Sequence, residues 1–396
     1  FFHAEDGIRD PLWSRGLGDV YKRQGEFAAE HWNPKLKEEG LSLTRYKFEN
    51  YIAELWYRSD TKMSLLSGAP FDDPTWWLLH NDQIVAARDM INDFAGSQRM
   101  LGHTVITPGQ DGWMDEVDRA IEVLKPDSWK SYTIGDPLSP SKYPWRLDDE
   151  KLMYPFYEKA VKAYRNGGPK PVICIHKGLL PPDYETSFKG VWQYATVDDV
   201  PKAAQDWPEM NFVIYHSALR PFLELPDQAW NEFEESGGYI KWSSDLAAIP
   251  EKYGVSNVYA EIGSTFANSA VAHPRFCAAF ISTLVKGMGA DHVVWGTDTV
   301  WYGSPQWQIE AMRRLEVPED MQKKYDLPAL GGENSLTKQA IFGLNSARLY
   351  ELGLNEAKNL PDMPSFSEDK IGQLAERFKE EGGKPSNKRY GLVRTA

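Results

Sequence analysis

Four stretches of the sequence share a pattern in which a short apolar run ends directly at an ionisable side chain. Two of the runs end at a histidine, one at a glutamate and one at an aspartate. Imidazole nitrogens and carboxylate oxygens are the usual ligands of catalytic metal ions, and they also carry protons in general acid–base catalysis. The runs and the residues that follow them are 172–175 with His176, 212–215 with His216, 258–260 with Glu261, and 293–297 with Asp298.

Each of these four residues also has a plainer interpretation. A single histidine after a strand is more often a hydrogen-bonded rim residue than a metal ligand. Asp298 could cap the next helix, which is a common role for aspartate, and Glu261 could pair with a neighbouring lysine or arginine. Packing requirements alone would seldom place four such residues at successive strand ends, so the pattern favours a functional site.

The elements that must position these residues alternate along the chain. Between 62 and 352, short apolar runs bounded by turn residues alternate with helical patterns, which predicts a parallel sheet with helices outside it. The runs are apolar almost throughout, so both faces of the sheet should be covered. A doubly wound open sheet is an alternative on this evidence. The expected helices include 26–57, 77–94, 113–124, 151–165 and 370–381, and the expected early strands are 62–66, 101–106 and 129–133.

Four segments, 173–178, 213–217, 295–298 and 341–350, resemble the later landmarks of the amidohydrolase-related family. The resemblance extends from Lys62 to Gly353 and implies an α/β fold, the (β/α)8 TIM barrel, of which this chain would hold strands two to eight. It further implies that His176 and Asp298 bind a metal ion, which we expect to be Zn²⁺, with Mn²⁺ as the alternative. Asp298 would also serve as a base, and His216 would act on the substrate or on a bound water.

The chain departs from this family at strand one, where members carry a His-x-His pair. None of its eight histidines lies two residues from another. We therefore expect a barrel that lacks strand one, and a natural barrel without the pair is the alternative.

Residues 1–24 resemble translated sequencing-adapter sequence, a natural disordered arm being the other interpretation. The expected organisation is a non-native segment at 1–24, a barrel at 25–354 and a C-terminal extension at 355–396.

Three further residues, together with Glu261, are candidates for substrate contacts. Lys130, expected at the end of the strand 129–133, matches a position where some amidohydrolases carry a carbamylated lysine, but binding of a substrate anion or capping of a loop is favoured over that role. Arg220 could clamp a carboxylate or form a surface ion pair. Trp301 could wall the site for an unsaturated substrate or serve ordinary packing.

These observations predict a metal-dependent hydrolase acting on a small organic acid through an activated water. A nonoxidative decarboxylase and an inactive truncated barrel are the alternatives.

The net charge of −13 disfavours nucleic acid as a partner, and no run reaches the roughly 18 apolar residues of a membrane span. The two cysteines, Cys174 and Cys277, exclude a disulfide framework and should be reduced, buried thiols. We expect a cytoplasmic protein, although an export signal could have been lost upstream, and a homodimer stays open as the assembly.

Overall fold

The computed structural model describes the central part of the chain, from Tyr51 onward with short gaps. The segment 1–24, most of the helix expected at 26–57, Trp301 and much of 355–396 lie outside the described residues. The described ranges are 51–77, 79–137, 139–221, 226–299, 304–352, 354–355, 360–361 and 368–385.

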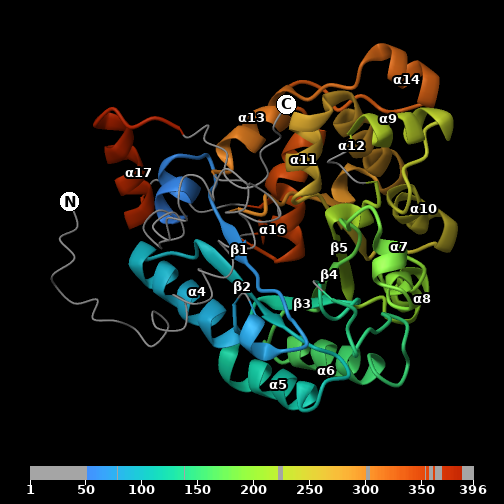
Figure 1. Cartoon of the computed structure of the whole chain (residues 1–396). Coiled ribbons are helices and arrows are strands. Elements are labelled where there is room, and N and C mark those ends of the chain that lie inside the picture. The colour runs from blue at the N-terminus through green and yellow to red at the C-terminus, as the bar shows by residue number, and fades with distance from the viewer. Residues whose placement is uncertain are drawn as a thin grey trace, which may run out of the picture.

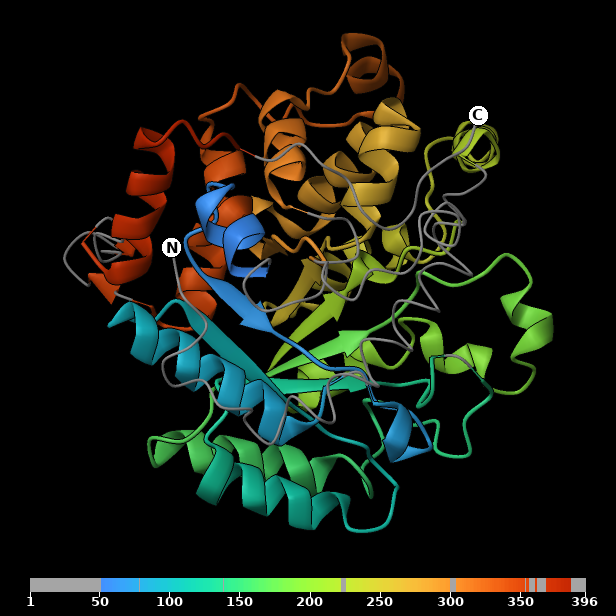
Figure 2. The ribbon, with the colours of Figure 1, turned by 60° about the vertical axis from the view of Figure 1, so that its left-hand side comes forward.

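A single parallel sheet of seven strands organises the fold, and its strands are hydrogen-bonded in chain order from β1 to β7. The sheet curves, and helices lie outside it (Figures 1 and 2). Sequential order, parallel direction and outer helices are the features of a (β/α) barrel with one strand fewer than eight, which confirms the predicted fold class. The strands are β1 (Ser64–Leu66), β2 (Met100–Val105), β3 (Ser128–Tyr132), β4 (Val172–His176), β5 (Asn211–Tyr215), β6 (Val258–Glu261) and β7 (Val293–Val294).

The helices differ from the expected ones mainly at their ends. The helix expected at 77–94 begins at Asn81, because the Gln83 side chain accepts a hydrogen bond from the backbone nitrogen of His80 and so defines the first turn. The strand expected at 293–297 pairs only over β7. The principal helices are α4 (Asn81–Ala95), α5 (Trp113–Arg119), α6 (Tyr154–Arg165), α8 (Val200–Asp206), α9 (Pro226–Glu235), α10 (Ser243–Tyr253), α11 (Thr265–Ala272), α12 (Pro274–Met288), α13 (Gln306–Arg314), α14 (Glu319–Tyr325), α16 (Asn345–Leu349) and α17 (Lys370–Glu380).

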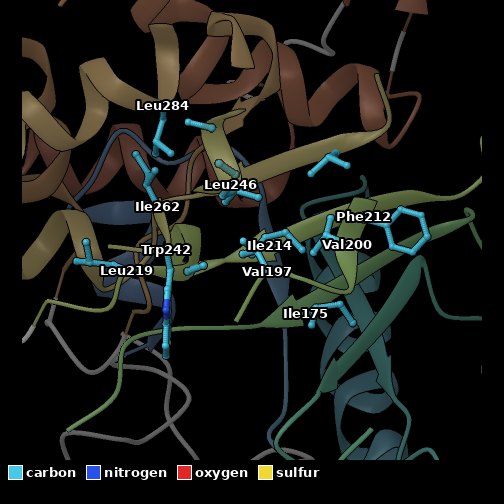
Figure 3. Close-up of a cluster of buried hydrophobic side chains, with 14 of the residues drawn as sticks. Ile175, Val197, Val200, Phe212, Ile214, Leu219, Trp242, Leu246, Ile262 and Leu284 are labelled. Carbon is cyan, nitrogen blue, oxygen red and sulfur yellow. The ribbon is translucent and has the colours of Figure 1, made fainter. Parts of the chain in front are cut away.

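The main core lies between the outer face of the sheet and the helices. Strand residues alternate between faces, so Ile175, Phe212 and Ile214 point outward and pack with Leu246 and Leu284 of the helical layer (Figure 3). Burial of these side chains is the main source of stability for such a layer. Both cysteines are buried free thiols, as predicted. Among the described residues, no helix has the length and apolar character that crossing a bilayer requires.

A buried ion pair joins the C-terminal helix α17 to the sheet. The carboxylate of Asp369 caps α17 by accepting from the Gly372 nitrogen at 2.7 Å, and it also pairs with the Arg99 guanidinium next to β2. Arg99 Nη2 lies 2.8 Å from Asp369 Oδ1. Ile371 packs in the same region against Trp56. The part of the predicted C-terminal extension that the structure describes over 370–380 is therefore packed on the barrel.

Candidate functional site

The four ionisable residues at the strand ends meet at one end of the sheet. His176 ends β4, His216 follows β5, Glu261 ends β6, and Asp298 follows β7. Since all seven strands are parallel, their carboxyl ends lie together at one end of the barrel, which we call the mouth. His216 contacts the other three: its Nε2 lies 2.9 Å from His176 Nδ1, its backbone nitrogen 3.1 Å from Glu261 Oε2, and its Nδ1 4.0 Å from Asp298 Oδ2.

The hydrogen bonds of His216 determine which ring nitrogens carry protons. Its Nδ1 lies 2.8 Å from the Gly263 carbonyl oxygen, which can only accept, so Nδ1 is the donor. Desolvation lowers the pKa of both His216 and His176, and both rings are neutral. His216 Nε2 then accepts from His176 Nδ1, and the lone pair of His176 is left on Nε2, where an electrophile can bind it.

Glu261 is the most deeply enclosed carboxyl group of the mouth. Its oxygens accept from the backbone nitrogens of His216 and Gly263, the latter at 2.6 Å. Burial, with repulsion from Asp298, raises the pKa of Glu261 to about 8. Gly296 leaves the room that this carboxyl group needs, because a Cβ there would lie 1.5 Å from Glu261 Oε1. Burial thus favours the protonated form of the Glu261 carboxyl group.

Asp298 is more open to solvent and is held by Ser264. The Ser264 hydroxyl donates to Asp298 Oδ2, and the Asp298 side chain keeps 32% of its surface exposed. Both residues have left-handed backbones, with φ of 58° at Ser264 and 47° at Asp298. His216 and Ser217 share this conformation at the end of β5, with φ of 60° and 48°. Such strain in non-glycine residues is typical of positions where geometry serves function.

The predicted substrate contacts have different environments. Lys130 lies in the middle of β3 rather than at its end, in register with Cys174, so its side chain faces the barrel interior. Arg220 forms an ion pair with Glu185, with Nε 2.9 Å from Oε1, and lowers the pKa of that carboxyl to about 2. The side chain of Trp301 lies outside the described residues.

Three residues of the mouth were missed by the sequence analysis. Ser264 contacts Asp298, and the ring of Tyr132 stacks on His176 with centroids 4.4 Å apart and planes 13° apart. Tyr215 lies beside His216. The signal that could have found the tyrosines is the alternation of strand residues, which places Tyr132 and Tyr215 on the same inward face as Lys130 and Cys174.

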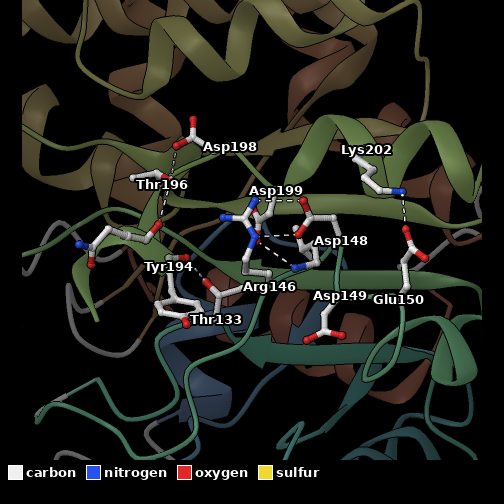
Figure 4. Close-up of polar contacts among 12 residues, drawn as sticks. Thr133, Arg146, Asp148, Asp149, Glu150, Tyr194, Thr196, Asp198, Asp199 and Lys202 are labelled. Atoms are coloured by element: carbon white, nitrogen blue, oxygen red, sulfur yellow. Dashed lines mark hydrogen bonds and ion pairs between the residues drawn. The ribbon is translucent and has the colours of Figure 1, made fainter. Parts of the chain in front are cut away.

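A buried lysine fixes the chain immediately after His176. Lys177 Nζ lies 2.9 Å from Asp199 Oδ1 and donates to the carbonyl oxygens of Tyr194 and Thr196. Asp199 also accepts from the Leu147 nitrogen at 2.9 Å, which ties the loop after β3 to the loop after β4. Figure 4 shows Asp199 at the centre of this group, close to Arg146 and Asp148. The chain immediately after β4 is therefore anchored to these two loops.

The donor groups suit a metal ion in type. Nε2 of His176 and the carboxylate of Asp298 are an imidazole and a carboxylate, the ligand types of catalytic Zn²⁺ and Mn²⁺ sites. Over the described ranges, however, no group of three or more His, Cys, Asp and Glu side chains is arranged to hold a metal ion. His176 and Asp298 would thus supply two ligands, and the remaining ligands would be water or groups outside the described ranges.

Comparisons with known proteins give weak structural matches only. Neither a protein-family model nor a curated protein sequence matches the chain. An uncharacterised TIM-barrel protein from Bordetella bronchiseptica is 13% identical, with a TM-score of 0.48 over 86% of this chain and 92% of that one. A 2,6-dihydroxybenzoate decarboxylase from Rhizobium is 13% identical, with a TM-score of 0.43 over 73% and 84% of the two chains. A 5-carboxyvanillate decarboxylase from Sphingomonas paucimobilis is 15% identical, with a TM-score of 0.38 over 73% and 78%. Because these identities and scores are low, the function proposed below rests on the residues of this chain.

Proposed function

We propose that this chain is a metal-dependent enzyme that acts on a small organic acid at the mouth formed by His176, His216, Glu261 and Asp298. The observation that carries the proposal is the contact between His176 and His216 beside the Asp298 carboxylate. It leaves one imidazole lone pair and one partly exposed carboxylate at the same strand ends. A divalent cation held by these two groups would supply Lewis-acid polarisation of a substrate oxygen.

The chain's own residues divide the remaining tasks. His216 orients His176 through their hydrogen bond and is itself held by the Gly263 carbonyl. Ser264 holds one oxygen of Asp298 and so fixes the carboxylate plane. The ring of Tyr132 covers one face of His176 and excludes water from it.

Nonoxidative decarboxylation is the reaction that these groups support best. Loss of carbon dioxide leaves a carbanion that must be protonated, so the site needs a group that still carries a transferable proton at physiological pH. Glu261 has this property, because burial keeps its pKa at about 8. Hydrolysis is the second candidate, and it is favoured by Asp298, whose partial exposure would let the carboxylate take a proton from an attacking water.

The two reactions can be separated with a panel of small carboxylic acids. The protein is incubated with Mn²⁺ in isotopically labelled water, and released carbon dioxide and label incorporation are measured by mass spectrometry. Carbon dioxide release that His216→Ala and Glu261→Gln abolish would support the decarboxylase. Label in the product without carbon dioxide would support the hydrolase. Neither product with any acid of the panel would contradict the proposal.

A further inference from the structure

Lys130 is a buried cation whose ammonium group has no hydrogen-bond partner within the described part of the chain. The residue is 2% exposed, and its Nζ is enclosed without an acceptor. An ammonium group has three protons to donate, and burying one without acceptors is costly. This environment accordingly lowers the pKa of Lys130 to about 8. The side chain is therefore one that a ligand with acceptor oxygens would stabilise.

Two aromatic rings enclose the ammonium group. Its Nζ lies 3.5 Å from the centroid of the Tyr215 ring and 5.0 Å from that of Tyr132. Ring faces attract a cation but provide no acceptor for its protons. Both tyrosines are half-buried residues. Tyr132 and Tyr215 lie in register with His176, two residues nearer the carboxyl ends of the strands than the layer of Lys130 and Cys174, so the ammonium group lies one layer deeper than the two tyrosines.

A chain of buried polar groups holds Tyr215 in place from below. The Tyr215 hydroxyl lies 3.0 Å from His103 Nε2, and His103 Nδ1 lies 2.8 Å from Ser128 Oγ. Ser128 Oγ lies in turn 3.0 Å from the Tyr350 hydroxyl. The interior of such a barrel is usually filled by branched aliphatic side chains, so this polar chain is a departure from the common pattern. It fixes the ring on which the Lys130 ammonium group rests.

The other candidate cation near the mouth is already neutralised. Arg220 is paired with both carboxylate oxygens of Glu185, and its Nη2 also donates to the Pro182 carbonyl at 3.1 Å. Binding a ligand carboxylate at Arg220 would require this pair to break. Lys130 needs no such rearrangement, so Lys130 is the better candidate for binding a ligand carboxylate.

We propose that Lys130, seated on the rings of Tyr132 and Tyr215, binds the carboxylate of an organic-acid ligand and so makes the mouth selective for acids. This inference rests on the proposed function, since it names the group that recognises the substrate of the same site.

The test is a binding measurement with matched ligands. Acetate, pyruvate and benzoate are each compared with their uncharged amides by titration calorimetry on the full chain near neutral pH. We expect carboxylates to bind and amides not to bind. We also expect Lys130→Met to weaken carboxylate binding by roughly tenfold or more, the size of one charge-assisted hydrogen bond. The matched control is Lys338→Met, because Lys338 is equally buried but donates to the Arg313 carbonyl at 2.9 Å, and this variant should bind as the wild type does.

A second measurement uses the unaltered chain. Acetylation of Lys130 by acetic anhydride, followed by peptide mass spectrometry, should be slowed by bound benzoate and not by benzamide. Equal carboxylate affinity in Lys130→Met, or equal labelling with both ligands, would overturn the inference. Carboxylate binding that is lost in His176→Ala and kept in Lys130→Met would assign the carboxylate to the metal site. That outcome would refute the role of Lys130 and leave the proposed function standing.

Discussion

Nδ1 of His176 lies 2.9 Å from Nε2 of His216, and the two rings meet edge to face with centroids 4.5 Å apart. Because His216 Nδ1 donates to the Gly263 carbonyl, the pair has one consistent pattern of protons when both rings are neutral. In this pattern Nδ1 of His176 carries the proton, and Nε2 keeps a lone pair that can bind an electrophile. His216 is therefore a positioning residue for His176 in addition to any contact that it makes with a substrate.

Removing His216 should weaken metal binding without abolishing it. In His216→Ala the His176 ring loses its hydrogen-bond partner and can rotate, and loss of such an orienting group commonly costs about 10–100-fold in metal affinity. The measurement is a Mn²⁺ titration followed by electron paramagnetic resonance. His273→Ala is the control, since His273 caps α12 by accepting from the Phe276 nitrogen. Unchanged affinity in His216→Ala would rule out the positioning role.

Glu261 should make the free energy of unfolding depend on pH between about 5 and 8. Its pKa is raised from 4.5 to about 8 in the folded chain, so the folded state holds a proton that the unfolded state has released. The free energy of unfolding that the protonated Glu261 contributes is fully present at low pH, and it is lost as the pH rises through the pKa of the folded state. Relative to Glu261→Gln, the wild type should therefore lose free energy of unfolding from about pH 5 to pH 8. Urea denaturation of both proteins across this range is the measurement, and a constant difference would contradict the raised pKa.

The space at Gly296 should be essential for Glu261. In Gly296→Ala the new methyl group would collide with Glu261 Oε1, and overpacking of this kind typically costs about 1–3 kcal/mol. Gly332→Ala is a matched control, because a Cβ there meets nothing within 4 Å, and it should change the free energy of unfolding by about 0.5 kcal/mol or less. Equal stabilities of the two variants would show that the Glu261 side chain can move aside.

The Arg99–Asp369 pair should hold α17 on the barrel. Arg99 is 3% and Asp369 6% exposed, and breaking a buried pair on one side typically costs about 3–5 kcal/mol. Arg99→Met should lower the free energy of unfolding by this amount and make 370–380 an early site of proteolysis. Replacing both partners in Arg99→Met with Asp369→Asn should recover part of the loss. A loss below about 1 kcal/mol in the single variant would mean that apolar contacts of Ile371 are enough to dock the helix.

The sequence predicted the sheet and the end of it at which the four ionisable residues gather, because apolar runs and strand-end residues are local signals. The ends at His176 and Glu261 are reproduced to the residue. It did not predict the contact of Ser264 with Asp298, which depends on how two loops approach each other. Nor did it predict that Arg220 would be neutralised, or that the ammonium group of Lys130 would lie against tyrosine rings without a hydrogen-bond partner among the described residues. Both facts follow from the positions of distant residues, Glu185 in one case and Tyr215 in the other.

Metal content is the direct measure of the proposed site, in which His176 and Asp298 would hold a divalent cation. The full chain is loaded with Mn²⁺ or Zn²⁺, dialysed exhaustively and measured by elemental analysis beside His176→Ala, Asp298→Ala and the control His273→Ala. We predict near-stoichiometric metal in the wild type and the control and its loss in the other two variants. A wild-type chain without metal, or variants that retain it as the wild type does, would show that His176 and Asp298 do not form a metal site.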